Sequence, residues 1–150
     1  MATNFLWGGV GSVMHLLTTE LNAQTKATIT AYGPEINNSG GYQMGQMYIH
    51  LASAAFVIGD YFQGFLVPSN DTAGSTYPTL GTTAQWWGGA SSNYLSATIY
   101  INGTTAAQDE ILQFVTIPLG KFKTVGYPGT GVNLGATGNT ADLYPTPSQY

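Results

Sequence analysis

The sequence predicts an all-β fold, a single-domain antiparallel β-sandwich that is jelly-roll-like. About eight runs of residues are either largely apolar or alternate between apolar and polar residues, as strands of a sandwich do. Glycine and proline, which favour turns, separate these runs. The only stretch that could form a helix is Thr18 to Gln24, where a threonine could cap one or two turns. Many short strands with almost no helix are typical of sandwiches and jelly rolls.

The predicted strands follow one another along the whole chain. They lie at 27–32, 42–51, 61–67, 94–102 and 111–117, with a further strand from Phe122 and a last one within 132–144. Residues 13–17 form a strand or an irregular buried run, and 37–41 form a loop. Pro118 ends the strand 111–117 because proline has no N–H to donate, and Leu119-Gly120 turns the chain. We expect the last three strands to form a meander that closes the domain.

Alternation predicts which side chains are buried. In the strand 42–51, Tyr42, Met44, Gln46, Tyr48 and His50 share one face and the residues between them share the other. We expect Lys121 and Lys123 to face water. The predicted core contains Leu112, Phe114, Phe122, Val125, Ile99, Ile49 and Leu66.

Charge is the unusual feature of the composition. Charged residues make up 7% of the chain, whereas about 25% is usual in soluble domains. The three cations are Lys26, Lys121 and Lys123. A nucleic-acid-binding protein needs several cations to displace the counterions of phosphates, so we expect no nucleic-acid partner. The aromatic content of 13% indicates a folded rather than a disordered chain.

The chain is expected to form one domain over residues 1–150, with extended arms at 1–12 and 144–150. Glycines at 8, 9 and 11 and prolines at 145 and 147 suit arms that become ordered on a partner. No run of roughly 18 apolar residues occurs, so we expect no membrane-spanning segment and no membrane partner.

Several stretches at both ends of the chain resemble a known family. The C-terminal ones are Ile-Pro-Leu-Gly-Lys-Phe-Lys at 117–123, Gly-Val-Asn-Leu-Gly-Ala-Thr-Gly-Asn-Thr at 131–140, and Asp-Leu-Tyr at 142–144. The N-terminal ones are Trp7-Gly8 and Leu-Leu-Thr-Thr-Glu-Leu-Asn at 16–22. Gly40-Gly41-Tyr42 and Val67-Pro68-Ser69 match in the middle. Together they resemble small virion structural proteins of tailed bacteriophages, some of which are similar to capsid cement (decoration) proteins with a jelly-roll sandwich.

The resemblance implies a protein that is made in the host cytoplasm and assembled on the capsid surface of the virion. Its expected partners are the major capsid protein and copies of itself, in a homo-oligomer.

No group of residues predicts catalysis, so we expect no enzyme, no cofactor and no metal. A serine-type triad would need His15 or His50 to be oriented by a carboxylate and aimed at a nucleophile. We expect both to be ordinary packed or solvated histidines. Among the seven carboxylates, only Asp109 and Glu110 are adjacent, and neighbours on a strand point to opposite faces. Cysteine is absent.

Aromatic residues are the candidate interface residues. Trp86 and Trp87 lie in a long loop with Tyr77, and Tyr94 follows it. These side chains could pack under the loop, anchor a protein contact, or stack on sugar rings. Three further candidates lie in or beside the arms: Trp7, Tyr144 and Tyr150. The alternative to a cement protein is therefore a glycan-binding module at the tail tip or capsid exterior that uses the Trp86-Trp87 loop.

Overall fold

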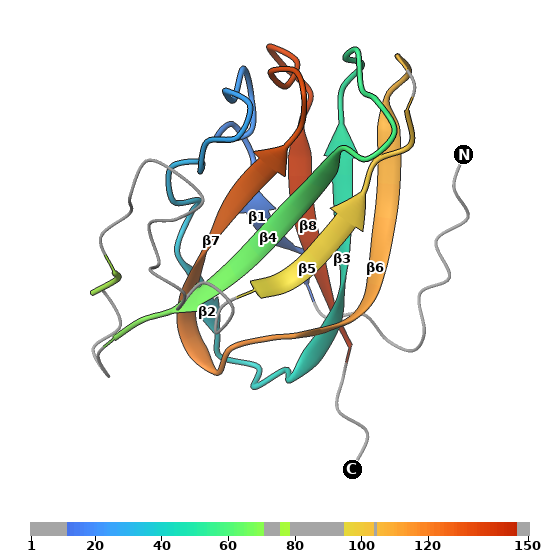
Figure 1. The fold of residues 1–150 in the computed structure, drawn as a ribbon. Coiled ribbons are helices and arrows are strands. Elements are labelled where there is room, and N and C mark those ends of the chain that lie inside the picture. Colours follow the sequence, from blue (N-terminus) through green and yellow to red (C-terminus); the bar gives the residue numbers. More distant parts are fainter. Residues whose placement is uncertain (1–11, 71–75, 79–94, 104, 147–150) are drawn as a thin grey trace.

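A computed structural model describes residues 12–70, 76–78, 95–103 and 105–146, and these residues are all-β, without helix (Figure 1). The strands in this part of the chain are β1 (Met14–Leu17), β2 (Ile36–Asn38), β3 (Met44–Leu51), β4 (Tyr61–Pro68), β5 (Leu95–Tyr100), β6 (Gln108–Thr116), β7 (Gly120–Gly129) and β8 (Thr140–Thr146). None of the described segments is a helix that could cross a membrane.

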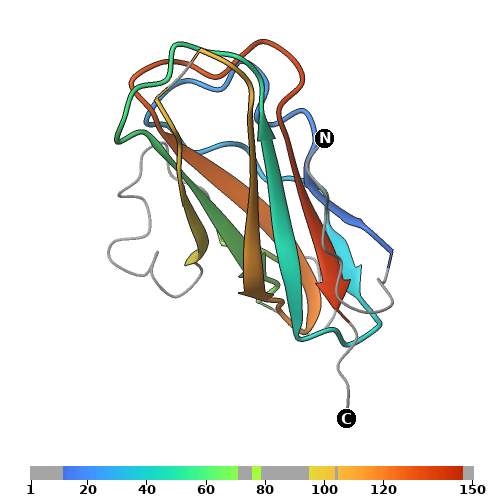
Figure 2. The same cartoon turned by 90° about the vertical axis from the view of Figure 1, so that its right-hand side faces the viewer.

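The strands form two four-stranded antiparallel sheets, which Figure 2 shows from the side as two layers. The first sheet has the order β1-β8-β3-β6 and the second has the order β2-β7-β4-β5. Four of the pairs, β1 with β8, β2 with β7, β3 with β6 and β4 with β5, are those of one long hairpin wound into two layers. The pairs β3–β8 and β4–β7 lie at the centre of the two sheets, where each joins two of these hairpin pairs within one sheet. The predicted antiparallel β-sandwich is confirmed.

The core lies between the two sheets, and alternation selects the residues that fill it. In β3 every second residue from Gly45 to Leu51 is buried, as the sequence predicted. Phe62 packs over Gly126 of the neighbouring strand, where a Cβ atom would lie only 2.7 Å from its ring. Predicted residues confirmed in this core are Ile49, Leu66, Ile99 and Phe122. The side chains of Leu112 and Phe114 lie outside the described part of the structure.

A second apolar cluster covers the outer face of the second sheet. Val67 and Val125, together with Phe65 and Tyr127, point away from the sandwich core but are buried. Ile29 packs against them, with Tyr32 and Tyr77 at the margin, so the connection between β1 and β2 acts as a cover. Val125 was therefore correctly predicted to be buried, but it belongs to this outer cluster.

The segment 27–32, predicted as a strand, is irregular. Its N–H groups at Ala27 and Thr30, and that of Gly33, donate to β7 carbonyls at Pro128, Gly126 and Thr124. Three residues of the segment therefore match two of β7, and Ala27 has a positive φ of 52°. Such a mismatch leaves unpaired residues, as in a bulge, and no regular ladder forms.

The predicted helix at Thr18–Gln24 is also wrong. The segment makes two successive turns, with hydrogen bonds from the Asn22 N–H to the Thr19 carbonyl and from the Gln24 N–H to the Leu21 carbonyl. Leu21 is fully buried in the core. Nucleating so short a helix is costly, and burial of Leu21 holds the turns instead.

The predicted meander of the last three strands is wrong as well. β6 and β8 lie on either side of β3 in the first sheet, whereas β7 lies in the second sheet. Residues 130–139 connect the two layers, although the last strand was predicted within 132–144. β2 includes Asn37 and Asn38, which were predicted as loop.

The boundary of the predicted C-terminal arm also changes. β8 extends through Thr146, so Tyr144 and Pro145 belong to the first sheet and pair with Gln46 and Gly45. Residues 1–11 and 147–150, which contain the rest of the two predicted arms, lie outside the described residues.

Candidate functional site

Polar side chains gather on the outer face of the first sheet, which we call the polar face. It consists of His15 on β1, Asp142 and Tyr144 on β8, Gln46, Tyr48 and His50 on β3, and Asp109 on β6. The registers bring these residues together, because His15 and Tyr48 both lie opposite Asp142, and His50 lies opposite Asp109.

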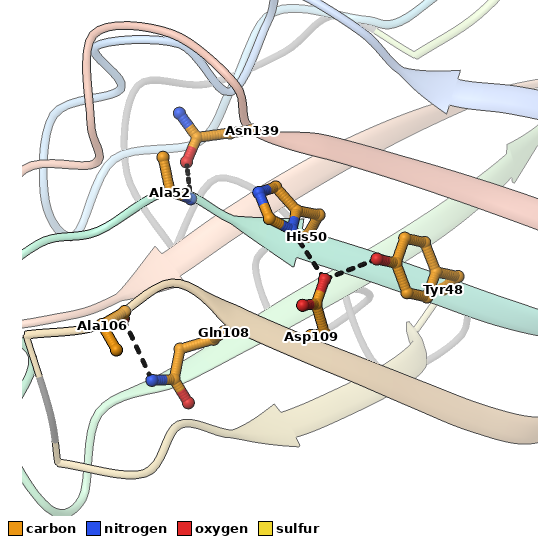
Figure 3. Close-up of polar contacts among 7 residues, drawn as sticks. All are labelled: Tyr48, His50, Ala52, Ala106, Gln108, Asp109 and Asn139. Atoms are coloured by element: carbon orange, nitrogen blue, oxygen red, sulfur yellow. Dashed lines mark hydrogen bonds and ion pairs between the residues drawn. The ribbon is translucent and has the colours of Figure 1, made fainter. Parts of the chain in front are cut away.

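Asp109 binds two side chains of β3 at once (Figure 3). Its Oδ1 atom accepts a hydrogen bond from the Tyr48 hydroxyl at 2.5 Å and contacts the His50 Nδ1 atom at 2.6 Å. A carboxylate can only accept, so the imidazole donates from Nδ1 and its Nε2 is left as an acceptor in the neutral ring. The hydrogen bonds from Tyr48 and then His50 lower the pKa of Asp109. The same bond to Asp109, followed by burial, raises the pKa of Tyr48 to about 12.

Buried amides fix the ends of the strands that carry this cluster. Asn139 is fully buried, and its Oδ1 accepts from the Ala52 N–H at 2.9 Å, just after His50 (Figure 3). Gln108 is buried and donates to the Ala106 carbonyl at 3.2 Å. Because Gln108 points inward, alternation directs Asp109 outward, toward Tyr48 and His50.

His15 makes a second pair of the same kind. Its Nδ1 atom lies 2.7 Å from Asp142 Oδ1. The imidazole is 65% exposed, whereas the carboxylate is 17% exposed. Both histidines are thus oriented by an aspartate, which the sequence did not indicate. The partners lie 127 and 59 positions apart in the chain, and only the sheet register brings them together.

An imidazole oriented by a carboxylate is half of a serine-type triad. Among the described residues, neither histidine has a hydrogen bond to a serine or threonine hydroxyl. The described residues also contain no group of three histidines and carboxylates that could hold a metal. What the geometry provides is a surface of hydrogen-bonding groups whose two carboxylates already have partners within the chain.

Tyr77, a predicted interface residue, lies against the second sheet. Its ring centroid is 5.7 Å from that of Tyr32, and the ammonium of Lys123 lies 4.8 Å from the Tyr77 ring centroid. Its hydroxyl donates to Glu35 at 3.0 Å, and Glu35 is paired with Lys121 at 3.0 Å. The bonds from Lys121 and then Tyr77 lower the pKa of Glu35. The two lysines are half-buried in these contacts, although the sequence predicted that they face water.

The other candidate interface residues divide into two groups. Tyr144 lies on the polar face and is half-buried. The remaining ones lie outside the described residues: Trp7, Trp86, Trp87, Tyr94 and Tyr150.

No protein-family model matches the sequence, and no curated protein matches it either.

Proposed function

We propose that this chain is a virion structural protein of a tailed bacteriophage, a cement or decoration protein that binds the lattice of the major capsid protein. It acts on the capsid surface as a homo-oligomer, and its contacts with the lattice are largely uncharged. The motifs at 16–22, 117–123 and 131–140, which resemble such virion proteins, support this proposal.

The observation that carries the proposal is that the described charged side chains already have bonding partners within the chain. Each of the three lysines has a partner within the chain: the Gly131 carbonyl for Lys26, Glu35 for Lys121, and two tyrosine rings for Lys123. The carboxylates whose side chains are described are also bonded within the chain, and they are Glu20, Glu35, Asp60, Asp109 and Asp142.

These internal bonds matter because a charged group that becomes buried at an interface without bonding partners is costly. A surface whose charged groups already have bonding partners can be covered by another protein at a lower desolvation cost, and polar side chains such as Tyr48 can still accept hydrogen bonds. On a repeating lattice, weak contacts of this kind add up to firm attachment.

The strand order supports a jelly roll in particular. A long hairpin wound into two four-stranded sheets is the arrangement expected of a jelly roll made of two Greek keys. Since one fold serves many functions, the fold agrees with the proposal but does not carry it.

Saturation binding tests the proposal. Shells assembled from the major capsid protein, without this chain, are incubated with the purified protein and then imaged by electron cryomicroscopy. We expect one set of sites that repeats with the lattice and is fully occupied. Absence of any site that repeats with the lattice, or binding to host polysaccharide without binding to shells, would contradict the cement function. The second of these outcomes would support the glycan-binding alternative.

A further inference from the structure

The connection between β3 and β4 ends in an exposed apolar turn, residues 57–60, which we call the apolar tip. Ile58 is 91% exposed, which makes it the most exposed of the large apolar side chains that the structure describes, and Val57 beside it is 56% exposed. The β3–β4 connection lies at the same end of the sandwich as the β7–β8 connection (Figures 1 and 2).

The turn has a defined backbone conformation. The Asp60 N–H donates to the Val57 carbonyl at 3.1 Å, and Gly59 has a φ of +102°. A positive φ at the third residue is the mark of a type II turn, where glycine is favoured. Ile58 therefore occupies the corner of the turn, and its side chain is presented to solvent.

Asp60 is a buried clamp that holds the tip through hydrogen bonds. This residue is 5% exposed, and its carboxylate accepts hydrogen bonds from the N–H groups of Val57 and Gly131, each at 3.0 Å. Its carbonyl accepts from the Ile101 N–H at 2.8 Å. Gly103 lies in the β5–β6 connection, and a Cβ atom there would lie 2.6 Å from the Ile58 nitrogen. This connection therefore packs directly against the turn. Two other connections, β5–β6 and β7–β8, thus hold the tip in place.

We propose that the apolar tip is an anchor that inserts Ile58 and Val57 into an apolar, uncharged pocket of the major capsid protein. This inference rests on the proposed function and assigns it a contact point. Because the backbone of the turn is already held by hydrogen bonds, it loses little conformational entropy on binding, and more of the gain from burying its side chains appears as affinity. A few residues that fill desolvated pockets carry most of the binding energy of many interfaces.

Charge favours a protein pocket over a lipid surface. The carboxylate of Asp60 is buried in the clamp, and the ammonium of Lys26, the lysine bonded at this end, donates to the Gly131 carbonyl at 3.2 Å. Attraction to anionic lipid requires clusters of cations. Even a myristoyl chain, with many more methylenes than these two side chains, gives only marginal membrane binding.

The test compares Ile58→Asp with Leu119→Asp on shells that lack this protein. Leu119 is a matched control because it is 68% exposed and lies in the β6–β7 connection at the other end of the sandwich. We expect Ile58→Asp to weaken binding to shells roughly 10- to 100-fold, the range expected from losing burial of one large aliphatic side chain. Leu119→Asp should bind like the unmodified protein. Both variants should keep the same thermal midpoint, which shows that they fold.

The outcomes separate the anchor from the function. If the unmodified protein and Ile58→Asp bind shells equally, the anchor is wrong and the cement function stands. If the unmodified protein does not bind shells, the cement function fails and the anchor with it. Equal losses in both variants would indicate general apolar adhesion and overturn the anchor. If the unmodified protein binds phosphatidylglycerol vesicles and Ile58→Asp does not, the tip binds lipid and the proposed protein pocket is wrong.

Discussion

Replacing Phe122 by alanine should remove a large part of the stability of the sandwich. This side chain is 0% exposed, and its residue lies in β7 between Ile36 of β2 and Pro68 of β4. Truncating a buried phenylalanine costs about 3–5 kcal/mol, because the cavity adds to the lost transfer free energy. For a chain of this size, each kcal/mol lowers the thermal midpoint by roughly 2–4 °C. We therefore expect a midpoint roughly 6–20 °C lower.

Urea unfolding followed by circular dichroism measures this loss. Leu119→Ala is the matched control, because Leu119 is close in sequence but 68% exposed, and its free energy of unfolding should change by less than about 0.5 kcal/mol. A loss of under about 1 kcal/mol for Phe122→Ala would refute the register of β7. A slip by one residue turns Phe122 outward and a neighbouring lysine inward.

Local pattern predicted most of the strands and the buried face of β3. Alternation between Met44 and Leu51 identified the inward residues of β3, and Pro118 marked the end of the preceding strand correctly. Pattern carries no information on which strand lies beside which, so the last three strands were predicted as a meander. Irregular segments also escaped prediction, because the segment around Ile29 is held by tertiary hydrogen bonds to β7.

The polar face could not be predicted for the same reason. Asp109 and His50 are far apart in the sequence and meet only because β3 and β6 pair in one particular register. The apolar tip had a local signal in Ile58-Gly59-Asp60, since a glycine after an apolar residue favours a turn. Nothing local indicated that Asp60 would be buried as a clamp.

Two further predictions concern single side chains. Thr124→Val should raise the free energy of unfolding by about 1 kcal/mol or more, because Thr124 Oγ1 is buried without a hydrogen-bond partner; an unchanged or lower thermal midpoint would contradict this. The pKa of Tyr48 is raised to about 12, above the ordinary value of about 10, so its contribution to stability is complete below pH 10 and is lost as the pH rises toward 12. In an ultraviolet absorbance titration, the component near pH 12 should disappear in Tyr48→Phe and move to lower pH in Asp109→Asn. Identical titration curves for the unmodified protein and both variants would refute the hydrogen bond between Tyr48 and Asp109.

The most direct test of uncharged attachment is release of the protein from shells by salt. The Debye length falls from about 10 Å at 0.1 M salt to about 3 Å at 1 M, so an attachment that depends on ion pairs weakens steeply over this range. Because the charged side chains described here are few and already bonded within the chain, we expect the bound fraction to stay nearly constant up to 1 M salt and to fall in mild urea. Steep release by salt alone would contradict the account and would indicate an acidic surface that binds a basic partner.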